Sequence, residues 1–167
     1  LKRLGMIEKM QGSHFQSKQS VQFVTQDGKL SAPFYFMKHM KHEAAYTWQV
    51  KRSDFDIMMR DNAIEVGAEF REGTSVKELI RDENDLPTAV NVISSDGEET
   101  ISARMFLDCT GRDAVTMHKN KWREGDPNLK KMALWTYYKG AKRDEGVDEG
   151  ATTVAYVDEK GWFWYIP

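Results

Sequence analysis

One amphipathic helix stands among several short strand-like runs, and this arrangement limits the chain to a mixed α/β fold. Residues 53–66 begin with Ser53, a residue type that caps helices, and end before Gly67. Apolar side chains recur along one face of this segment at the helix period, namely Phe55, Met58, Met59, Ala63 and Val66. We therefore expect one well-formed helix in a fold that also contains sheets.

Strand-like runs lie on both sides of this helix. The dipeptide Asp27-Gly28 separates residues 21–24 from residues 32–36, and an Asp-Gly turn between two such runs predicts a β-hairpin. After the helix, four runs predict successive strands, of which the last three form a meander: residues 68–70, 74–80, 88–94 and 100–107. Three more predicted strands follow, with a charged loop at 142–149 between two of them: residues 132–140, 152–157 and 162–166.

Two shorter segments are also predicted to be helical. Apolar side chains have helical spacing in residues 1–10, and Gly12 then ends the pattern. Residues 114–119 predict a short helix after the glycine turn at Gly111. A strand, a glycine turn and a helix in this order let the backbone approach a phosphate group closely.

The composition excludes several classes of protein. The chain has 167 residues and a net charge of −2, so it has no field that would gather nucleic acid or an anionic membrane. Its apolar runs are far shorter than the ~20 residues of a membrane-spanning helix. A single cysteine, Cys109, excludes an internal disulfide and fits a reducing, cytoplasmic setting. His39 and His42 have no Cys or carboxylate at ligand spacing, so we expect no metal site.

The last six residues are mostly aromatic. Strand alternation would place Trp162, Trp164 and Ile166 on one face, where they could either fill a core or line a pocket. The order Trp-x-Trp-x-Ile-Pro, preceded by a glycine and ending at Pro167, resembles the signature of flavin-dependent halogenases. In that family the motif lies between the flavin and the substrate chamber. The resemblance therefore implies a substrate pocket formed by Trp162, Trp164, Ile166 and Pro167.

A second motif lies before the predicted hairpin. Residues 18–24, Lys-Gln-Ser-Val-Gln-Phe-Val, resemble the family segment that contains the catalytic lysine. The resemblance implies that Lys18 is catalytic: chloride or bromide is oxidised at the flavin, and hypohalous acid then reaches the lysine. An ammonium can donate a hydrogen bond to the hypohalous oxygen and polarise it. Without the resemblance, Lys18 would be read as a solvated surface lysine.

Two further motifs resemble flavin-binding segments. Arg52-Ser53-Asp54-Phe55-Asp56 resembles a helix start shared by halogenases and FAD-dependent aromatic hydroxylases, and it implies that Gln49 and Arg52 contact the cofactor. Residues 108–112, Asp-Cys-Thr-Gly-Arg, resemble the family's Asp-Ala-(Ser/Thr)-Gly-Arg turn beside the FAD. By that resemblance Asp108, Gly111 and Arg112 are also cofactor-binding residues. Taken alone, the first segment would be a surface helix with a solvated arginine, and the second an ordinary loop.

The resemblance extends over nearly the whole chain and implies its architecture. We expect part of a FAD/NAD(P)-binding, Rossmann-like hydroxylase fold with an antiparallel substrate-domain sheet. Residues 1–50 would be a substrate-domain hairpin with its flanking helix, 51–125 part of the FAD-binding domain, and 126–167 substrate-domain strands. The pyrophosphate-binding Gly-x-Gly-x-x-Gly does not occur in the sequence and would stand before it. We therefore expect an internal fragment of a longer protein, inactive in isolation.

The implied function is halogenation of an electron-rich aromatic ring. The reaction would use reduced FAD from a separate flavin reductase, dioxygen, and chloride or bromide. The substrate would be a small aromatic molecule, free or bound to a carrier. Two alternatives stay open: a flavin monooxygenase or a geranylgeranyl-reductase-like oxidoreductase of the same fold, and a non-catalytic module whose aromatic face binds an apolar ligand.

Overall fold

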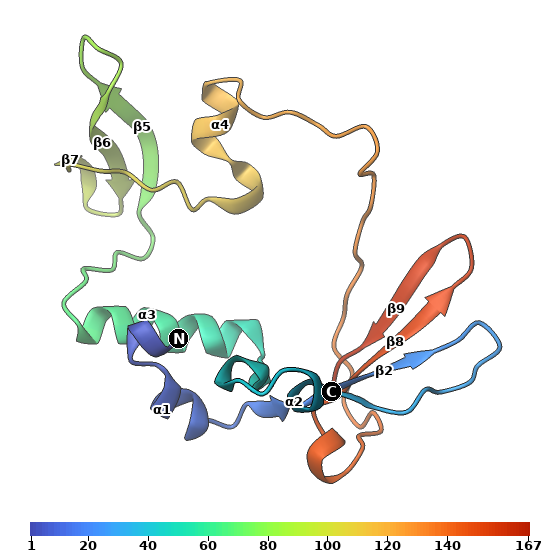
Figure 1. The fold of residues 1–167 in the computed structure, drawn as a ribbon. Helices are drawn as coiled ribbons and strands as arrows, with labels where there is room; N and C mark the ends of the chain where they lie inside the picture. Colours follow the sequence, from blue (N-terminus) through green and yellow to red (C-terminus); the bar gives the residue numbers. More distant parts are fainter. The chain divides into compact units, whose positions relative to one another are not determined.

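The computed structural model describes the backbone of residues 1–167 and the side chains of all residues except 115. Two compact units make up the chain: unit 1 comprises residues 1–68 and 136–167, and unit 2 comprises residues 69–135. The main elements of both units are labelled in Figure 1. Each unit contains helices and sheets, which confirms the predicted mixed α/β class.

The beginning of the chain is broken at Gly5, so the predicted helix over residues 1–10 is wrong as one element. A single 3-10 turn, η1 (Lys2–Leu4), ends where Gly5 adopts φ 66°, and helix α1 (Ile7–Gln11) then follows. A positive φ suits glycine and interrupts the helical backbone. Met6 and Met10 are fully buried and form the centre of the local core.

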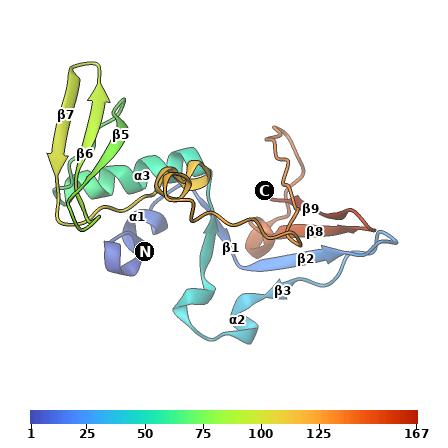
Figure 2. The same cartoon turned by 90° about the horizontal axis from the view of Figure 1, so that it is seen from above.

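The largest sheet has four strands in the order β3-β2-β8-β9 (Figure 2). Strands β2 (Ser20–Val24) and β3 (Phe34–Tyr35) form the predicted hairpin, with Gly28 at φ 79° in the turn. Strand β8 (Thr152–Val157) pairs in parallel with β2, and β9 (Gly161–Tyr165) pairs with β8 in antiparallel fashion. The parallel pairing joins two ends of the sequence that local patterns do not connect.

A second sheet has two strands, one directly before the hairpin and one after it. Strand β1 (Gln16–Lys18) pairs antiparallel with β4 (Thr47–Gln49). Between the hairpin and β4 the chain forms two short turns of helix, α2 (Phe36–His39) and η2 (Glu43–Ala45). The sequence analysis predicted none of these four elements, because strands of three residues and helices of three or four have no readable period.

Helix α3 (Arg52–Glu65) confirms the predicted long helix and packs on the start of the chain. Phe55 and Phe15 meet ring edge to face at 6.3 Å, and buried Asn62 donates a hydrogen bond to the Leu4 carbonyl at 3.1 Å. The predicted capping by Ser53 is wrong: its hydroxyl donates to the Asp54 carboxylate, and the cap position carries no side-chain bond. Val66, placed on the apolar face, lies beyond the helix and is 78% exposed.

Unit 2 is the predicted meander followed by a turn and a short helix. Strands β5 (Ser75–Arg81), β6 (Pro87–Ser94) and β7 (Gly97–Ser102) form an antiparallel sheet in that order. The 3-10 turn η3 (Gly111–Asp113) leads into helix α4 (Val115–Lys119), as predicted. A final 3-10 turn, η4 (Gly146–Asp148), belongs to unit 1 and precedes β8.

Three predicted strand segments are not strands. Residues 68–70, 103–107 and 132–140 have no ladder partner among the residues that the structure describes. Leu107 and Leu134, for example, are 81% and 87% exposed. An apolar run becomes a strand only where a neighbouring chain segment offers backbone partners, and these runs lack one here. Across the described chain no helix has the length and apolar character needed to cross a membrane.

Candidate functional site

Lys18 is the last residue of β1 and lies at the junction of the two sheets of unit 1. It pairs with Thr47 of β4, while Ser20, two residues on, begins the four-stranded sheet. Lys18 is half-buried, and burial lowers the pKa of its ammonium below the ordinary value of 10.5. Among the described residues no carboxylate lies within 4.0 Å of the Lys18 ammonium. A partly desolvated ammonium without an anionic partner is a stronger acid and a better hydrogen-bond donor than a surface lysine.

The two tryptophans of the last strand share one face of it. Their ring centroids are 5.8 Å apart at 60°, an edge-to-face contact, as strand alternation predicts. Trp162, together with Phe23, Val154 and Tyr156, lines an open apolar groove on this face of the β2-β8-β9 sheet. Trp162 and Trp164 are each about half exposed, at 51% and 55%, so they line a surface rather than fill a core.

The last two residues of the motif do not share that groove. Pro167 lies with Tyr165 and Lys142 at a second groove on the opposite face of the sheet. The Tyr165 hydroxyl donates to the Lys142 carbonyl, which holds residues 141–144 against this face. Ile166 follows the end of β9 and is 55% exposed. Of the residues assigned to one pocket, Trp162 and Trp164 share one face of the sheet and Pro167 lies at a groove on the other face.

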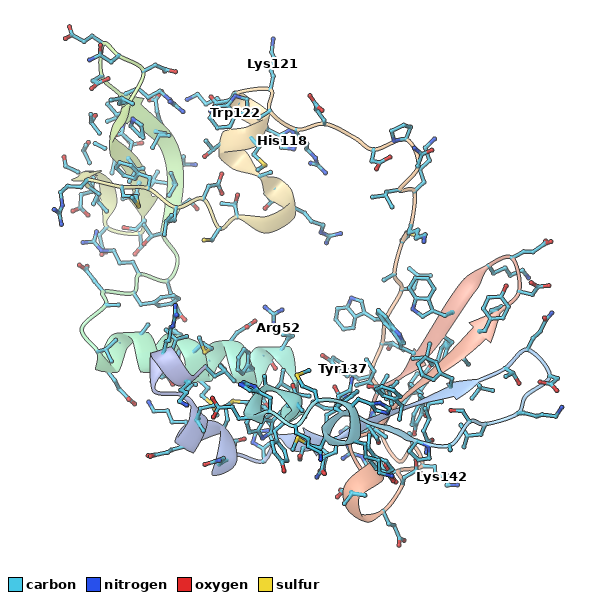
Figure 3. All side chains as sticks on the ribbon, in the orientation of Figure 1. Arg52, His118, Lys121, Trp122, Tyr137 and Lys142 are labelled. Carbon is cyan, nitrogen blue, oxygen red and sulfur yellow. The ribbon has the colours of Figure 1, made fainter. Side chains whose placement is uncertain are left out.

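Gln49 and Arg52 lie on either side of the link between β4 and α3. The Gln49 amide nitrogen donates to the Gly150 carbonyl at 3.3 Å and to the Thr152 hydroxyl at 2.6 Å. Both of its N–H donors are thereby used within unit 1, and only its oxygen is left for a ligand. Arg52, labelled in Figure 3, is exposed and forms an ion pair with Asp56 one turn along α3, at 3.1 Å.

Asp108 organises the glycine turn of unit 2. One carboxylate oxygen accepts hydrogen bonds from the backbone N–H and hydroxyl of Thr110, and the other accepts from the Thr116 N–H at 2.8 Å. The Thr110 hydroxyl, the two backbone N–H groups and the Thr116 side chain hold the pKa of this carboxyl well below its usual range. Gly111 follows with φ 64°, and open space surrounds the position that a Cβ would occupy. Arg112 is exposed, and its carbonyl accepts from Arg123.

Some of these residues, each considered within its own unit, suit a contact with a dinucleotide such as FAD. The exposed Arg52 guanidinium can bind a phosphate, because its present partner is a solvated carboxylate that contributes little. The open space at Gly111 lets a cofactor approach the backbone. Asp108 fits less well as a direct ligand, since both of its oxygens already hold the turn.

No metal centre is formed by the residues that the structure describes, where no group of three His, Cys, Asp or Glu side chains comes together. The His39 ring stacks on Phe34 at 4.1 Å, and His42 caps η2 by accepting from the Ala44 N–H. His118 lies within 2.8 Å of the Arg123 guanidinium, an unsuitable neighbour for a metal ligand.

One polar cluster of unit 1 was not predicted at all. Ser20 and Tyr35 donate hydrogen bonds to the two oxygens of Asp148, a residue that the sequence analysis assigned only to a charged loop. Ser20 and Asp148 are 128 positions apart. No local pattern reports such a contact, and only the parallel pairing of β2 with β8 brings the two segments together.

Comparison with known proteins places the chain among halogenases. The tryptophan halogenase family profile matches residues 5–167. A 1H-pyrrole-2-carbonyl-peptidyl-carrier-protein brominase of Pseudoalteromonas luteoviolacea (strain 2ta16) is 31% identical over 169 residues, which are 100% of this chain and 39% of that protein. A flavin-dependent halogenase of Armillaria mellea, armH4, is 33% identical over 132 residues, or 74% of this chain and 25% of that protein.

A solved structure shows the same fold. The flavin-dependent halogenase CmlS superposes with a TM-score of 0.78 at 27% identity, covering 100% of this chain and 30% of CmlS. The chain thus spans well under half the length of these relatives.

Proposed function

The chain belongs to the tryptophan halogenase family, and from this premise we propose that the whole protein halogenates an electron-rich aromatic ring with reduced FAD, dioxygen and chloride or bromide. The observation that carries the proposal is the half-buried Lys18 at the junction of two sheets, whose ammonium has no carboxylate partner among the described residues. Lys18 is also the first residue of the segment 18–24, which resembles the family segment with the catalytic lysine.

FAD, when bound, supplies with dioxygen the oxidising equivalents that convert halide to hypohalous acid. We propose that Arg52 of unit 1 and Arg112 of unit 2 are each, separately, candidates for a contact with a cofactor phosphate, and that Gly111 allows a close approach of the cofactor to the backbone. Gln49 is assigned to the flavin edge through its free amide oxygen, and Asp108 to holding the turn. The reduced form would come from a separate flavin reductase, and we place the reaction in the cytoplasm, where NADH is available to that reductase.

Lys18 would act on the hypohalous acid. Its ammonium donates a hydrogen bond to the oxygen of the acid and weakens the bond between oxygen and halogen. The ring carbon then forms a bond to the halogen while the oxygen–halogen bond breaks. The departing hydroxide combines with the proton that the ring loses, so one aromatic C–H and one hypohalous acid give one carbon–halogen bond and one water.

The substrate ring would meet the electrophile beside the terminal aromatic strand. Trp162 lines an open apolar groove and packs edge to face against Trp164, and an aromatic side chain in an apolar groove favours a planar aromatic ring as its partner. An open groove also admits a ring that is attached to a larger carrier. The name of the related brominase describes such a substrate, a pyrrole-2-carbonyl group on a peptidyl carrier protein. We therefore propose a phenol, pyrrole or indole, free or bound to a carrier.

The test uses the full-length protein with FAD, a flavin reductase and NADH. Mass spectrometry would follow a panel of phenols, pyrroles and indoles in chloride or bromide, for wild type and Lys18→Ala. We expect a halogen isotope pattern that Lys18→Ala abolishes. Lys29→Ala is the matched control, because Lys29 is exposed and paired with Asp27, and it should leave the product unchanged.

Other products would contradict the proposal. Hydroxylated products without a halide requirement would indicate a monooxygenase, and hydride transfer alone would indicate a reductase. A purified full-length protein that holds no flavin would indicate a non-catalytic binding module.

A further inference from the structure

Residues 146–150 lie directly against the strand that carries Lys18. At Gly150, a Cβ would be 2.1 Å from the Ser17 carbonyl oxygen and 2.9 Å from its carbonyl carbon. Both atoms belong to the backbone of β1, one residue before Lys18. Gly150 is buried, so the two backbones are packed in contact with no room between them.

Asp148 binds residues that follow Lys18 in the chain. Its Oδ1 accepts a hydrogen bond from the Ser20 hydroxyl at 2.7 Å, and its Oδ2 accepts from the Tyr35 hydroxyl at 2.8 Å. Ser20 is fully buried, so its hydroxyl has no water as an alternative partner. The bond from Tyr35 also raises the pKa of that phenol, which keeps it protonated as a donor.

Two amides complete the attachment. Gln16 donates to the Glu149 carboxylate at 3.3 Å, and Gln49, opposite Gln16 in the sheet, donates to the Gly150 carbonyl and the Thr152 hydroxyl. The residues before and after Lys18 are thus held by one short segment, whereas the Lys18 ammonium has no carboxylate partner within the described chain. The position of the ammonium therefore depends on contacts made by its neighbours in the chain rather than on an ion pair of its own.

We propose that Asp148 is a positioning residue for Lys18, acting through Ser20 and Tyr35 to fix the bend between β1 and β2. The inference rests on the proposed role of Lys18 in halogen transfer. It predicts that loss of the Asp148 bonds leaves hypohalous acid formation intact and uncouples it from the ring. Misplacement of a reacting group by about 1 Å costs up to ~100-fold in rate.

The experiment compares Tyr35→Phe, Ser20→Ala and Asp148→Asn in the full-length protein. Tyr35→Phe and Ser20→Ala each remove a single hydroxyl. We therefore expect these two variants to fold even where Asp148→Asn does not. Two quantities are measured: halogenated ring, and free hypohalous acid caught by a chemical trap. We expect the ratio of halogenated ring to trapped acid to fall roughly 10- to 100-fold while total oxidised halide stays constant. Asp126→Asn is the control and should leave the ratio unchanged, because the exposed Asp126 carboxylate accepts a hydrogen bond from the nearby Asn128 N–H and lies in unit 2.

A second measurement tests position without activity. Amine acylation followed by mass spectrometry gives the labelling rate of Lys18 relative to Lys29, and we expect this ratio to change several-fold in Tyr35→Phe. An unchanged labelling ratio and an unchanged product ratio would overturn the inference. Equal losses of both halogenated ring and trapped acid would overturn it too, since they would indicate a general structural role. If the wild-type protein does not halogenate any ring but Tyr35→Phe still changes the labelling ratio of Lys18, the proposed function is refuted and the positioning role stands.

Discussion

Replacing Gly150 by alanine tests the packing beneath Lys18 most directly. The new Cβ would begin 2.1 Å from the Ser17 carbonyl oxygen, and real Cβ atoms essentially never approach closer than 3.0 Å. The two backbones would therefore have to separate by about 0.9 Å, from 2.1 to 3.0 Å. Neither neighbour is a flexible side-chain end, so strand β1 itself must move.

Overpacking of this kind costs about 1–3 kcal/mol, so we expect the Tm to fall. Because the displaced strand ends at Lys18, halogenation should also fall, by up to ~100-fold. Thermal unfolding and product formation would be measured together on the full-length protein.

Gly125→Ala is the matched control for this substitution. Gly125 has no positive φ and no atom within 4 Å of an added Cβ, so the same methyl group meets open space there. We expect it to leave Tm and product formation nearly unchanged. If Gly150→Ala behaves like Gly125→Ala, the contact between residues 146–150 and β1 is not what holds Lys18, and the reasoning fails.

Three further predictions concern the cofactor and the groove. Arg52→Ala should weaken FAD binding roughly 10- to 100-fold, which is the contribution of a charged hydrogen bond to a phosphate. Asp56→Ala removes the ion-pair partner of the same guanidinium and should not weaken FAD binding. Fluorescence titration with FAD distinguishes the two variants. Trp162→Ala should raise KM several-fold for the aromatic substrate, since an aromatic contact contributes about 1 kcal/mol, whereas Trp122→Ala, in unit 2, should leave KM unchanged in steady-state kinetics. Asp108→Asn should weaken FAD binding. It should also make the free energy of unfolding depend less on pH at acid pH. The pKa of Asp108 in the folded chain lies below the ordinary 3.8, so its contribution is complete above that pH and is lost as pH falls through the folded pKa; equal acid unfolding of wild type and variant would contradict this.

The family and the fold class could be predicted from short stretches of sequence. Four motifs of five to seven residues identified the halogenases, and the match over residues 5–167 confirms that identification. The hairpin at Asp27-Gly28, helix α3 and the meander of unit 2 were predicted because each depends on turn residues and periodicity within a few positions. Helix α1 was misjudged at Gly5, where one left-handed residue outweighs a regular apolar pattern.

The setting of the candidate site depends on contacts that are distant in sequence. Lys18 was identified by its motif, but its half-buried position comes from pairing with β4 and from the segment 146–150. Both oxygens of Asp148 are bonded to donors more than 100 residues away. The sequence by itself determined the family, helix α3, the hairpin and the meander, because motifs, turns and periodic faces are local; the roles of the site residues stay predictions. Only the tertiary structure decided that β2 pairs in parallel with β8 and that the half-buried Asp148 carboxylate accepts a hydrogen bond from buried Ser20 near the lysine, since pairing between distant segments leaves no mark on either segment alone.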